Sequence, residues 1–555
     1  MMKKLAKAFL GLIAAVAMLF TGLALPSSAV AADTTYTLTI NGTETGHTYE
    51  AYQVFSGKLS ENKLSDIQWG SGVAGEKMLN ALKVDTTFGD DDSNAFKDVT
   101  TASGVAEKLS AYQTDSAEAK EFAKVVGANL KDAAGTSQEG TSTEQGKYPY
   151  TISNLAAGYY LVKDKNNSVP EGDDAYTDFI LKIVKNTTAT PKSDVPTVEK
   201  KVKDVNDSTG DTSDWQDSAD HDINDTIEYK LTGDLPSNYD SYTKYAYKFT
   251  DTLSKGLTLN KDSIKVYAVK GAGEQQTKTE IKKLEAAGDD GYTVATANYT
   301  GTGDKYEGGT VLTIDFADLK QAAAATAGET LTIDKDTKIV VEYSATLNGN
   351  AVIGSAGNPN KVDLTFSNNP GGEGTGTTPE DTVIVFTYKV IVNKVKSDNS
   401  ALAGAKFKLE KKIKGQDGAE DTWKELGEKE ATGDGSNVFT WEGLDDGDYR
   451  LTETQTPDGY NSIDPIEFTV TAEHKVVWDG TDDALTSLNG NNASGLITFT
   501  PSLPDGSLST NVVNKSGSEL PETGGIGTTI LYVAGAVCVA AAGVWFGLRR
   551  RNSVR

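Results

Sequence analysis

The residues with the clearest chemical potential lie at the end of the chain. The pentapeptide Leu520-Pro521-Glu522-Thr523-Gly524 is followed by an uncharged stretch, Gly525 to Leu548, and then by Arg549 to Arg551. A spanning helix needs about 20 apolar residues, so this stretch is long enough to cross a bilayer once. The arginines would keep its end in the cytoplasm. The pentapeptide would then lie where the helix leaves the membrane, and chemistry there would act on the boundary between the outer chain and its anchor.

This order and spacing resembles the cell-wall sorting signal of Gram-positive bacteria. In that family, a sortase thiolate attacks the carbonyl between Thr523 and Gly524 and holds the upstream chain as a thioester until an amine takes it over. The resemblance implies a sorting signal at 520–555, with a membrane helix at 526–548. The alternative is an ordinary single-span anchor that follows a chance match to the motif.

The beginning of the chain predicts export. Three lysines within the first seven residues precede an apolar run from Ala8 to Leu25, and small residues follow from Ala29 to Ala32. This pattern is typical of a secretory signal peptide, which we place at 1–32, and a first membrane helix is the alternative. The exported product would therefore run from about Asp33 to Thr523.

The composition argues against several classes of partner and site. The formal charge is −26, with 79 Asp and Glu against 53 Lys and Arg, which disfavours nucleic acid and anionic lipid. The preferred interpretation of this negative charge is that it keeps the protein soluble. The only cysteine, Cys538, lies inside the predicted terminal helix, so no disulfide is expected.

Metal and cofactor sites are not predicted either. His47, His221 and His474 are far apart and lack metal-ligand spacing, which argues against zinc and against a histidine-based catalytic triad. Acidic loops at 90–92 and 204–214 could hold calcium, but neither matches an EF-hand loop, and solvated turns are the preferred interpretation.

Shifts in composition divide the exported chain into three β-rich segments. Its length fits about three domains. The first, 33–191, opens with an alternating strand, Tyr36–Ile40, and contains a helix from Ser116 to Asp132 capped by Ser116 or Asp115. We predict an all-β fold of tandem Ig-like sandwiches, the first with a helical insertion.

Short strands separated by Gly, Asp and Asn turns fill the other two segments, 192–379 and 380–515. In the second segment we predict strands at 226–231, 244–250, 263–269, 311–316, 338–347 and 361–367. In the third we predict strands at 383–392, 406–410, 438–441, 449–453 and 466–471.

The chain resembles the backbone (major) pilins assembled by class C sortases over nearly its whole length. Tyr449 to Tyr460 looks like the E box of that family, and Gly46 to Gly57 resembles the opening of its N-terminal domain. Thr190-Pro191-Lys192-Ser193 lies where the pilin motif belongs, with Thr190 in place of the usual Tyr.

The resemblance implies that the Lys192 amine attacks the Thr523 thioester of the next subunit. Pro191 favours an extended, accessible segment around it. Lys185 and Lys182 are the fallback candidates, and a solvated linker lysine is the alternative interpretation of Lys192.

Pilins of this family also carry spontaneous Lys–Asn isopeptide bonds, each assisted by a carboxyl. In the third domain, of collagen-adhesin B type, the resemblance implies Lys394, Glu453 and Asn514. Strand parity places Val390, Val392 and Lys394 on one face. The alternative is three exposed polar residues.

In the second domain, of collagen-adhesin A type, the implied set is Lys200, Asp251 and Asn368. Asn360 and Asn369 are rivals for the asparagine, and parity favours Lys200 over Lys201. In the first domain no comparable set is found, because surface positions explain Lys163 and Asp164 better.

The expected function is that of the major structural subunit of a covalently polymerised, wall-anchored fimbria that supports adhesion. Expected partners are a class C sortase, a housekeeping sortase, identical subunits, tip or accessory pilins, and peptidoglycan, with no nucleic acid and no cofactor. A monomeric wall-anchored adhesin and an accessory pilin are the alternatives. A wall-anchored enzyme is disfavoured because no catalytic constellation is found.

Overall fold

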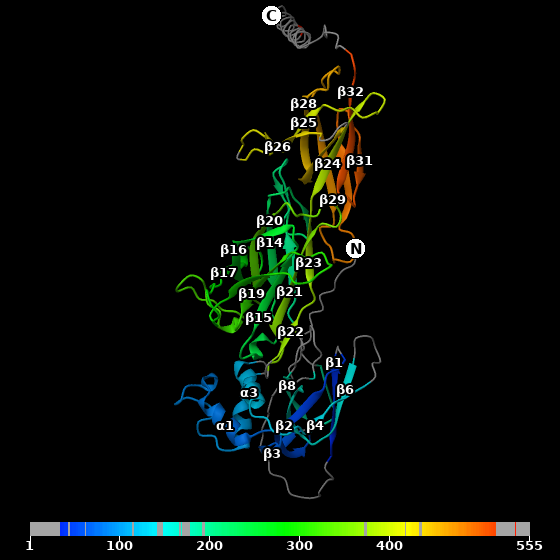
Figure 1. Ribbon diagram of the computed structural model, residues 1–555. Coiled ribbons are helices and arrows are strands. Elements are labelled where there is room, and N and C mark those ends of the chain that lie inside the picture. Colours follow the sequence, from blue (N-terminus) through cyan, green and yellow to red (C-terminus); the bar gives the residue numbers. More distant parts are fainter. Residues whose placement is uncertain are drawn as a thin grey trace, which may run out of the picture.

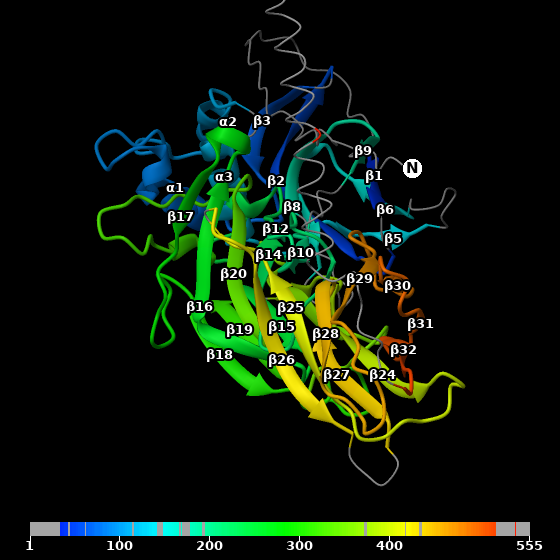
Figure 2. The same cartoon turned by 90° about the horizontal axis from the view of Figure 1, so that it is seen from above.

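Three β-rich domains follow one another along an elongated molecule in a computed structural model (Figure 1). The residues that the structure describes are 34–42, 45–61, 63–113, 116–140, 148–165, 168, 178–190, 195–370, 374–416, 418–431, 436–517 and 539. The prediction of an all-β chain of tandem sandwiches is confirmed. The view down the long axis shows the sheets of the second and third domains and the helices of the first (Figure 2).

The first domain is a sandwich with helices on one outer face. Apolar residues that alternate along the strands, such as Leu38 and Ile40, fill the space between its two sheets. One sheet has the order β5 (Gln138–Glu139), β6 (Tyr148–Leu155), β1 (Tyr36–Gly42) and β9 (Thr187–Ala189). The other has the order β3 (Lys63–Trp69), β2 (Tyr49–Ser60), β7 (Gly158–Asp164) and β8 (Asp178–Ile183), with β4 (Gly135–Thr136) beside β2.

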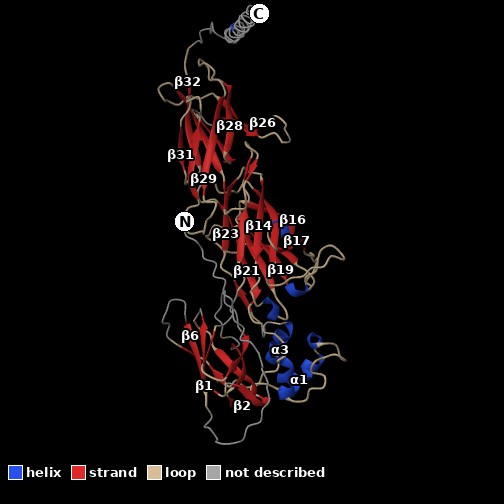
Figure 3. Ribbon diagram, turned by 180° about the vertical axis from the view of Figure 1, so that it is seen from behind, coloured by secondary structure: helices blue, strands red, loops and turns tan. Residues whose placement is uncertain are grey.

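The helical insertion is larger than the sequence predicted. The expected helix is α3 (Ala117–Gly127), which is shorter than expected and is capped by the Ser116 hydroxyl accepting from the Ala119 amide. Two further helices, α1 (Gly75–Val84) and α2 (Ala102–Leu109), and a 3₁₀ turn, η1 (Thr86–Phe88), complete it. Figure 3 shows α1 and α3 beside the strands of the first domain, with α3 nearer the second domain, and Lys120 of α3 pairs with Asp240 at 3.2 Å.

The second domain is a larger sandwich around a core rich in tyrosine. Its first sheet has the order β10 (Val198–Val202), β14 (Thr226–Gly233), β20 (Lys338–Leu347), β16 (Leu257–Lys270) and β17 (Thr277–Glu280). Its second sheet has the order β13 (Ser218–Asp220), β23 (Asp381–Phe386), β21 (Asn358–Ser367), β15 (Tyr247–Leu253), β19 (Thr310–Phe316) and β18 (Thr293–Asn298), with β22 (Thr375–Thr377) beside β21. Smaller elements are β11 (Val205–Asn206), β12 (Asp211–Thr212), η2 (Tyr239–Ser241), η3 (Gly273–Gln275) and η4 (Leu319–Gln321).

The third domain brings its first and last strands side by side. One sheet has the order β27 (Val438–Leu444), β24 (Tyr388–Lys396), β32 (Ser507–Asn514) and β31 (Phe499–Ser502), with β24 parallel to β32. The other has the order β26 (Thr422–Glu430), β25 (Lys406–Ile413), β28 (Gly447–Gln455), β29 (Ile466–His474) and β30 (Leu485–Asn491).

The single strand predicted at 383–392 is wrong. The structure has two strands there, β23 and β24, and β23 belongs to the second domain's sheet. Val383 and Val385 lie in the core of the second domain, whereas Ile384 and Phe386 lie in that of the third. The apolar run from Val383 to Phe386 therefore contributes alternate side chains to the cores of two domains, although the boundary predicted after 379 assigned it to the third alone.

Several predicted features lie outside the described residues. They are the signal peptide at 1–32, Lys192, and the sorting motif Leu520 to Gly524 with its apolar stretch, of which only Val539 is described. Within the part of the chain that is described, no helix has both the length and the apolar character needed to cross a membrane.

Candidate functional site

Three lysines of the second and third domains have no solvent exposure. They are Lys200, Lys394 and Lys411, each 0% exposed. A buried ammonium group is costly unless it is paired or loses its proton. Each of these lysines is therefore a candidate for a functional or structural role that offsets this cost.

In the third domain, the three residues implied by the resemblance lie in contact. Lys394 leaves β24 at the level of Val512 on the parallel strand β32, two residues before Asn514. Its Nζ contacts the side-chain oxygen of Asn514 and lies 3.2 Å from Glu453 Oε1. Asn514 Nδ2 donates to both oxygens of Glu453, at 2.9 and 3.1 Å. The amine, the amide and the carboxyl therefore form one closed cluster.

This cluster is dry and suited to amide exchange. The side chains of Lys394 and Glu453 are both 0% exposed, and the Phe407 ring lies 5.4 Å from the amine. Burial lowers the pKa of Lys394, although the nearby Glu453 opposes the shift. A lysine that loses its proton becomes a nucleophile, and fixed proximity raises its effective concentration at the amide carbon.

In the second domain, Lys200 reaches across the sandwich from β10 to the opposite sheet. Its Nζ contacts Asp251 Oδ2 on β15 and donates to the Tyr343 hydroxyl at 3.0 Å. That hydroxyl lies 3.1 Å from each oxygen of Asp251 and accepts from Asn360 Nδ2 at 2.7 Å. Tyr343 thus connects the amine and the acid with an asparagine.

The choice of Asn368 as the asparagine of this set is not supported by the geometry, which brings Asn360 to the cluster instead. On neighbouring strands Asp251 pairs with Val362, two residues from Asn360. Asn368 lies six residues from Val362 in the other direction, which at about 3.3 Å per residue is roughly 20 Å along the strand. Asn360 is 0% exposed, and among the described residues its Oδ1 has no hydrogen-bond partner.

The lysine of the second set has the same electrostatics as Lys394. Burial lowers the pKa of Lys200, with Asp251 opposing, and burial raises the pKa of Asp251, with Lys200 opposing. Burial therefore shifts both groups toward their neutral forms, the forms that a nucleophilic amine and a proton-donating acid require. Sequence reasoning missed Tyr343 and also Tyr229, whose ring lies 5.3 Å from the Lys200 amine. Their alternation with apolar residues on β20 and β14 was the available signal.

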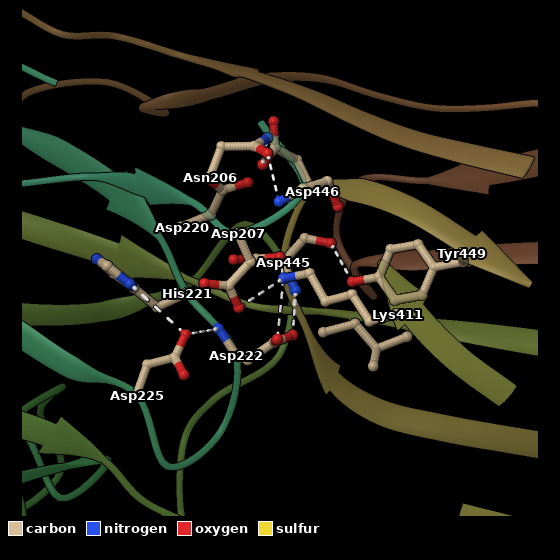
Figure 4. Close-up of polar contacts among 12 residues, drawn as sticks. Asn206, Asp207, Asp220, His221, Asp222, Asp225, Lys411, Asp445, Asp446 and Tyr449 are labelled. Atoms are coloured by element: carbon tan, nitrogen blue, oxygen red, sulfur yellow. Dashed lines mark hydrogen bonds and ion pairs between the residues drawn. The ribbon is translucent and has the colours of Figure 1, made fainter. Parts of the chain in front are cut away.

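Lys411 lies in a different kind of cluster, at the joint between the second and third domains (Figure 4). Its Nζ contacts Asp445 of its own domain and Asp222 of the second domain, the latter at 2.9 Å, and Asp207 follows at 3.5 Å. Asp222 Oδ1 also accepts from the Asp445 amide at 3.0 Å. Burial alone would lower the pKa of Lys411, but the carboxylates of Asp445 and Asp222 outweigh it and raise it. Lys411 therefore stays charged and serves as an ionic bridge between domains.

Removing this bridge should destabilise the joint. In Lys411→Ala, two buried carboxylates lose their counter-ion, and we expect a loss of about 3–5 kcal/mol, measured by denaturant unfolding of the exported protein. Lys412→Ala is the matched control, because Lys412 lies one residue on, is partly exposed and pairs, within the described part of the chain, with two partly exposed acids. For this variant we expect a loss of less than about 1 kcal/mol. Equal losses in the two variants would contradict a bridging role.

Two other expectations can be compared with the structure. Asp90, Asp91 and Asp92 are exposed, as solvated turns would be. Asp164, expected at the surface, is instead 0% exposed and lies 2.7 Å from His47 Nδ1. Sequence reasoning placed it after the strand, whereas β7 extends to Asp164 as its last residue and buries the side chain.

Comparison with known proteins adds independent findings. A family model described as a prealbumin-like fold domain matches residues 388–483, and one described as an LPXTG cell wall anchor motif matches residues 512–554. The trypsin-resistant surface T6 protein of Streptococcus pyogenes serotype M6 is 26% identical over 464 residues, covering 72% of this chain and 75% of that protein.

One solved structure has a similar fold, and a second aligns over most of the chain. The T6 backbone pilin of serotype M6 Streptococcus pyogenes, a modular three-domain structure, aligns with a TM-score of 0.50 at 16% identity, covering 88% of this chain and 100% of that one. The full-length major pilin SpaD from Corynebacterium diphtheriae aligns with a TM-score of 0.41 at 16% identity, covering 88% and 99%.

Proposed function

We propose that this chain, a cell-wall-anchored pilus subunit of the backbone type, polymerises by joining Thr523 of each subunit to Lys192 of the next. The observation that carries the proposal is the LPXTG anchor motif, which follows directly on the last strand of an elongated three-domain chain. The relatives are structural pilins and not enzymes, so the proposed role of the chain is that of a structural subunit.

The proposed polymerisation uses two peptide segments and an external enzyme. A class C sortase cleaves between Thr523 and Gly524, and the resulting thioester passes to the Lys192 amine of the next subunit. A housekeeping sortase then transfers the last subunit to peptidoglycan. The chain itself supplies only the acyl donor and the amine.

The second and third domains are each further proposed to close themselves with an isopeptide bond. In the third domain, neutral Lys394 Nζ attacks the side-chain carbonyl carbon of Asn514, while Glu453 holds the amide nitrogen through two hydrogen bonds. The new C–N bond replaces the old one, and the amide nitrogen leaves as ammonia after taking one proton from the amine by way of Glu453. In the second domain, Lys200, Asp251 and Asn360 have the corresponding roles.

The position of the third-domain bond suits a load-bearing shaft. The chain enters this domain on β24 and leaves it on β32, and these strands are parallel neighbours. A covalent tie between Lys394 and Asn514 passes tension directly from the entry strand to the exit strand, and the domain between them carries no load.

The polymer itself is tested on wall extracts of the producing cells. We expect immunoblots to show a ladder of high-mass species, which Lys192→Ala reduces to a single monomer band still attached to the wall. Deletion of Leu520 to Gly524 should remove both the ladder and the attachment. Lys185→Ala is the matched control, since Lys185 is an exposed lysine close to the same domain boundary.

The outcomes of this test separate the candidate functions. A wild-type chain that runs as one wall-bound band is a monomeric adhesin. A ladder that persists in Lys192→Ala but is lost in Lys185→Ala assigns the polymerising amine to Lys185.

A further inference from the structure

A second polar cluster lies at the joint between the second and third domains, next to the Lys411 bridge. It consists of Asp204 and Asp220 from the second domain and His474 from the end of β29 in the third. The Asp220 side chain is 4% exposed, that of His474 9% and that of Asp204 20%. The three side chains therefore meet in a mostly enclosed space to which both domains contribute.

The shortest distance in this cluster equals the separation of two ligands of a tetrahedral zinc ion. His474 Nε2 lies 3.3 Å from Asp204 Oδ2 and 3.8 Å from Asp220 Oδ1, longer than the roughly 2.7–2.9 Å of a charged hydrogen bond. Two ligands that each lie about 2.0–2.1 Å from a tetrahedral zinc ion are separated by about 3.3 Å. One candidate ligand atom from each of the three residues lies within 4.8 Å of the others.

A buried oxygen in the cluster is left without a partner. Among the described residues, Asp220 Oδ2 makes no hydrogen bond, although the residue is only 3% exposed. A buried carboxylate oxygen without a donor is costly, and a cation at this position would satisfy it.

The imidazole is held in the orientation that a metal requires. The Ser218 hydroxyl donates to the Lys475 carbonyl at 2.6 Å, so at 2.7 Å it accepts the Nδ1 proton of His474. This hydrogen bond fixes the tautomer and leaves Nε2 directed toward the two carboxylates. Metal-binding histidines almost always have such a partner on the other ring nitrogen.

The surrounding charge also favours a dication. Asp446 adds a third half-buried carboxylate in the field of Asp204 and Asp220, and Lys475, next to His474, is paired with Asp482 at 2.5 Å. With a neutral imidazole, the two carboxylate ligands carry two negative charges, which one divalent ion neutralises.

We propose that Asp204, Asp220 and His474 bind a zinc ion that joins the second domain to the third. The site goes beyond polymerisation and does not depend on it. Zinc is favoured over calcium because an imidazole nitrogen is one of the ligands and calcium takes oxygen ligands.

The test is zinc chloride titration of metal-free exported protein without a histidine tag. We expect native mass spectrometry to show one zinc ion per chain and calorimetry to show an increase in the melting temperature. Cobalt(II) should bind in place of zinc and give the visible absorption of a tetrahedral site. Calcium chloride at the same concentration should leave the melting temperature unchanged.

Three variants decide the assignment. Asp204→Asn and His474→Gln should each weaken zinc binding at least about 10-fold. His221→Gln should bind as the wild type does, because His221 is buried at the same joint and its Nε2 contacts the Lys203 carbonyl at 3.0 Å. Asp204→Asn replaces a partly exposed side chain with an isostere and keeps the test valid if His474→Gln does not fold. The proposal is overturned if the wild type binds no zinc, or if Asp204→Asn binds zinc as tightly as the wild type does. The cluster would then consist of a protonated His474 between two carboxylates.

Discussion

In protein carrying Glu453→Ala, the mass deficit of about 17 Da that marks the Lys394–Asn514 bond is expected to disappear. Each bond releases one ammonia, so wild-type exported protein should be about 34 Da lighter than its sequence mass and the variant about 17 Da lighter than its own. The physical reason is that Glu453 contacts both the amine and the amide nitrogen, and among the described residues no other carboxyl contacts Lys394 Nζ.

The same variant should also lose much of the stability of the third domain. The bond closes a loop of 120 residues, worth about 4–5 kcal/mol in the loop-entropy picture. For a domain of this size that corresponds to a melting temperature lower by about 10–20 °C. Scanning calorimetry would measure the shift, and trypsin should begin to cleave the third domain at temperatures where the wild type resists.

Glu410→Ala is the matched control for this experiment. Glu410 is a largely buried glutamate on the neighbouring strand, and it pairs with Arg450 at 3.0 Å. We expect this variant to be less stable than the wild type but to keep the full mass deficit. A wild-type mass equal to the sequence mass would refute both internal bonds.

The comparison of sequence and structure shows which kinds of contact a sequence can predict. The third-domain set follows from resemblance plus parity, because Lys394 and Asn514 lie at the ends of adjacent first and last strands. The second-domain asparagine does not follow, because parity fixes the face of a strand and not the position along it. Asn360 and Asn368 have the same parity, and only the register of β15 with β21 distinguishes them.

The helices of the first domain were predictable in part. In α2, Ala102, Val105, Ala106 and Leu109 are buried at the spacing i, i+3, i+4, i+7, and Thr101 caps the helix, so the signal was present but short.

The joint between the second and third domains was not predictable. Lys411 and Asp222 are 189 residues apart, and His474 and Ser218 are 256 apart, so no local pattern connects them. The acidic residues of these loops, whose composition predicts solvated turns, form a buried ionic cluster only because the two domains pack together.

The second large effect is expected at Asn360. In Asn360→Ala, the Lys200 amine loses its acceptor amide, and the deficit of about 17 Da assigned to the second domain should vanish. The bond would close a loop of roughly 160 residues, which is worth about 5 kcal/mol, so the unfolding transition of this domain should move to lower temperature. Intact mass and calorimetry on the same preparation measure both effects.

Asn368→Ala provides the comparison that makes this test specific. Asn368 is also a buried asparagine, 6% exposed, on the same chain segment, so it controls for the loss of a buried amide. We expect it to keep the full deficit, and peptide sequencing of the wild type by mass spectrometry should find Lys200 joined to Asn360. A Lys200–Asn368 bond would require β21 to slide by eight residues against β15, breaking the pairing of Asp251 with Val362 and withdrawing Asn360 from Tyr343. Loss of the deficit in Asn368→Ala and its retention in Asn360→Ala would therefore overturn the register of this sheet together with the assignment.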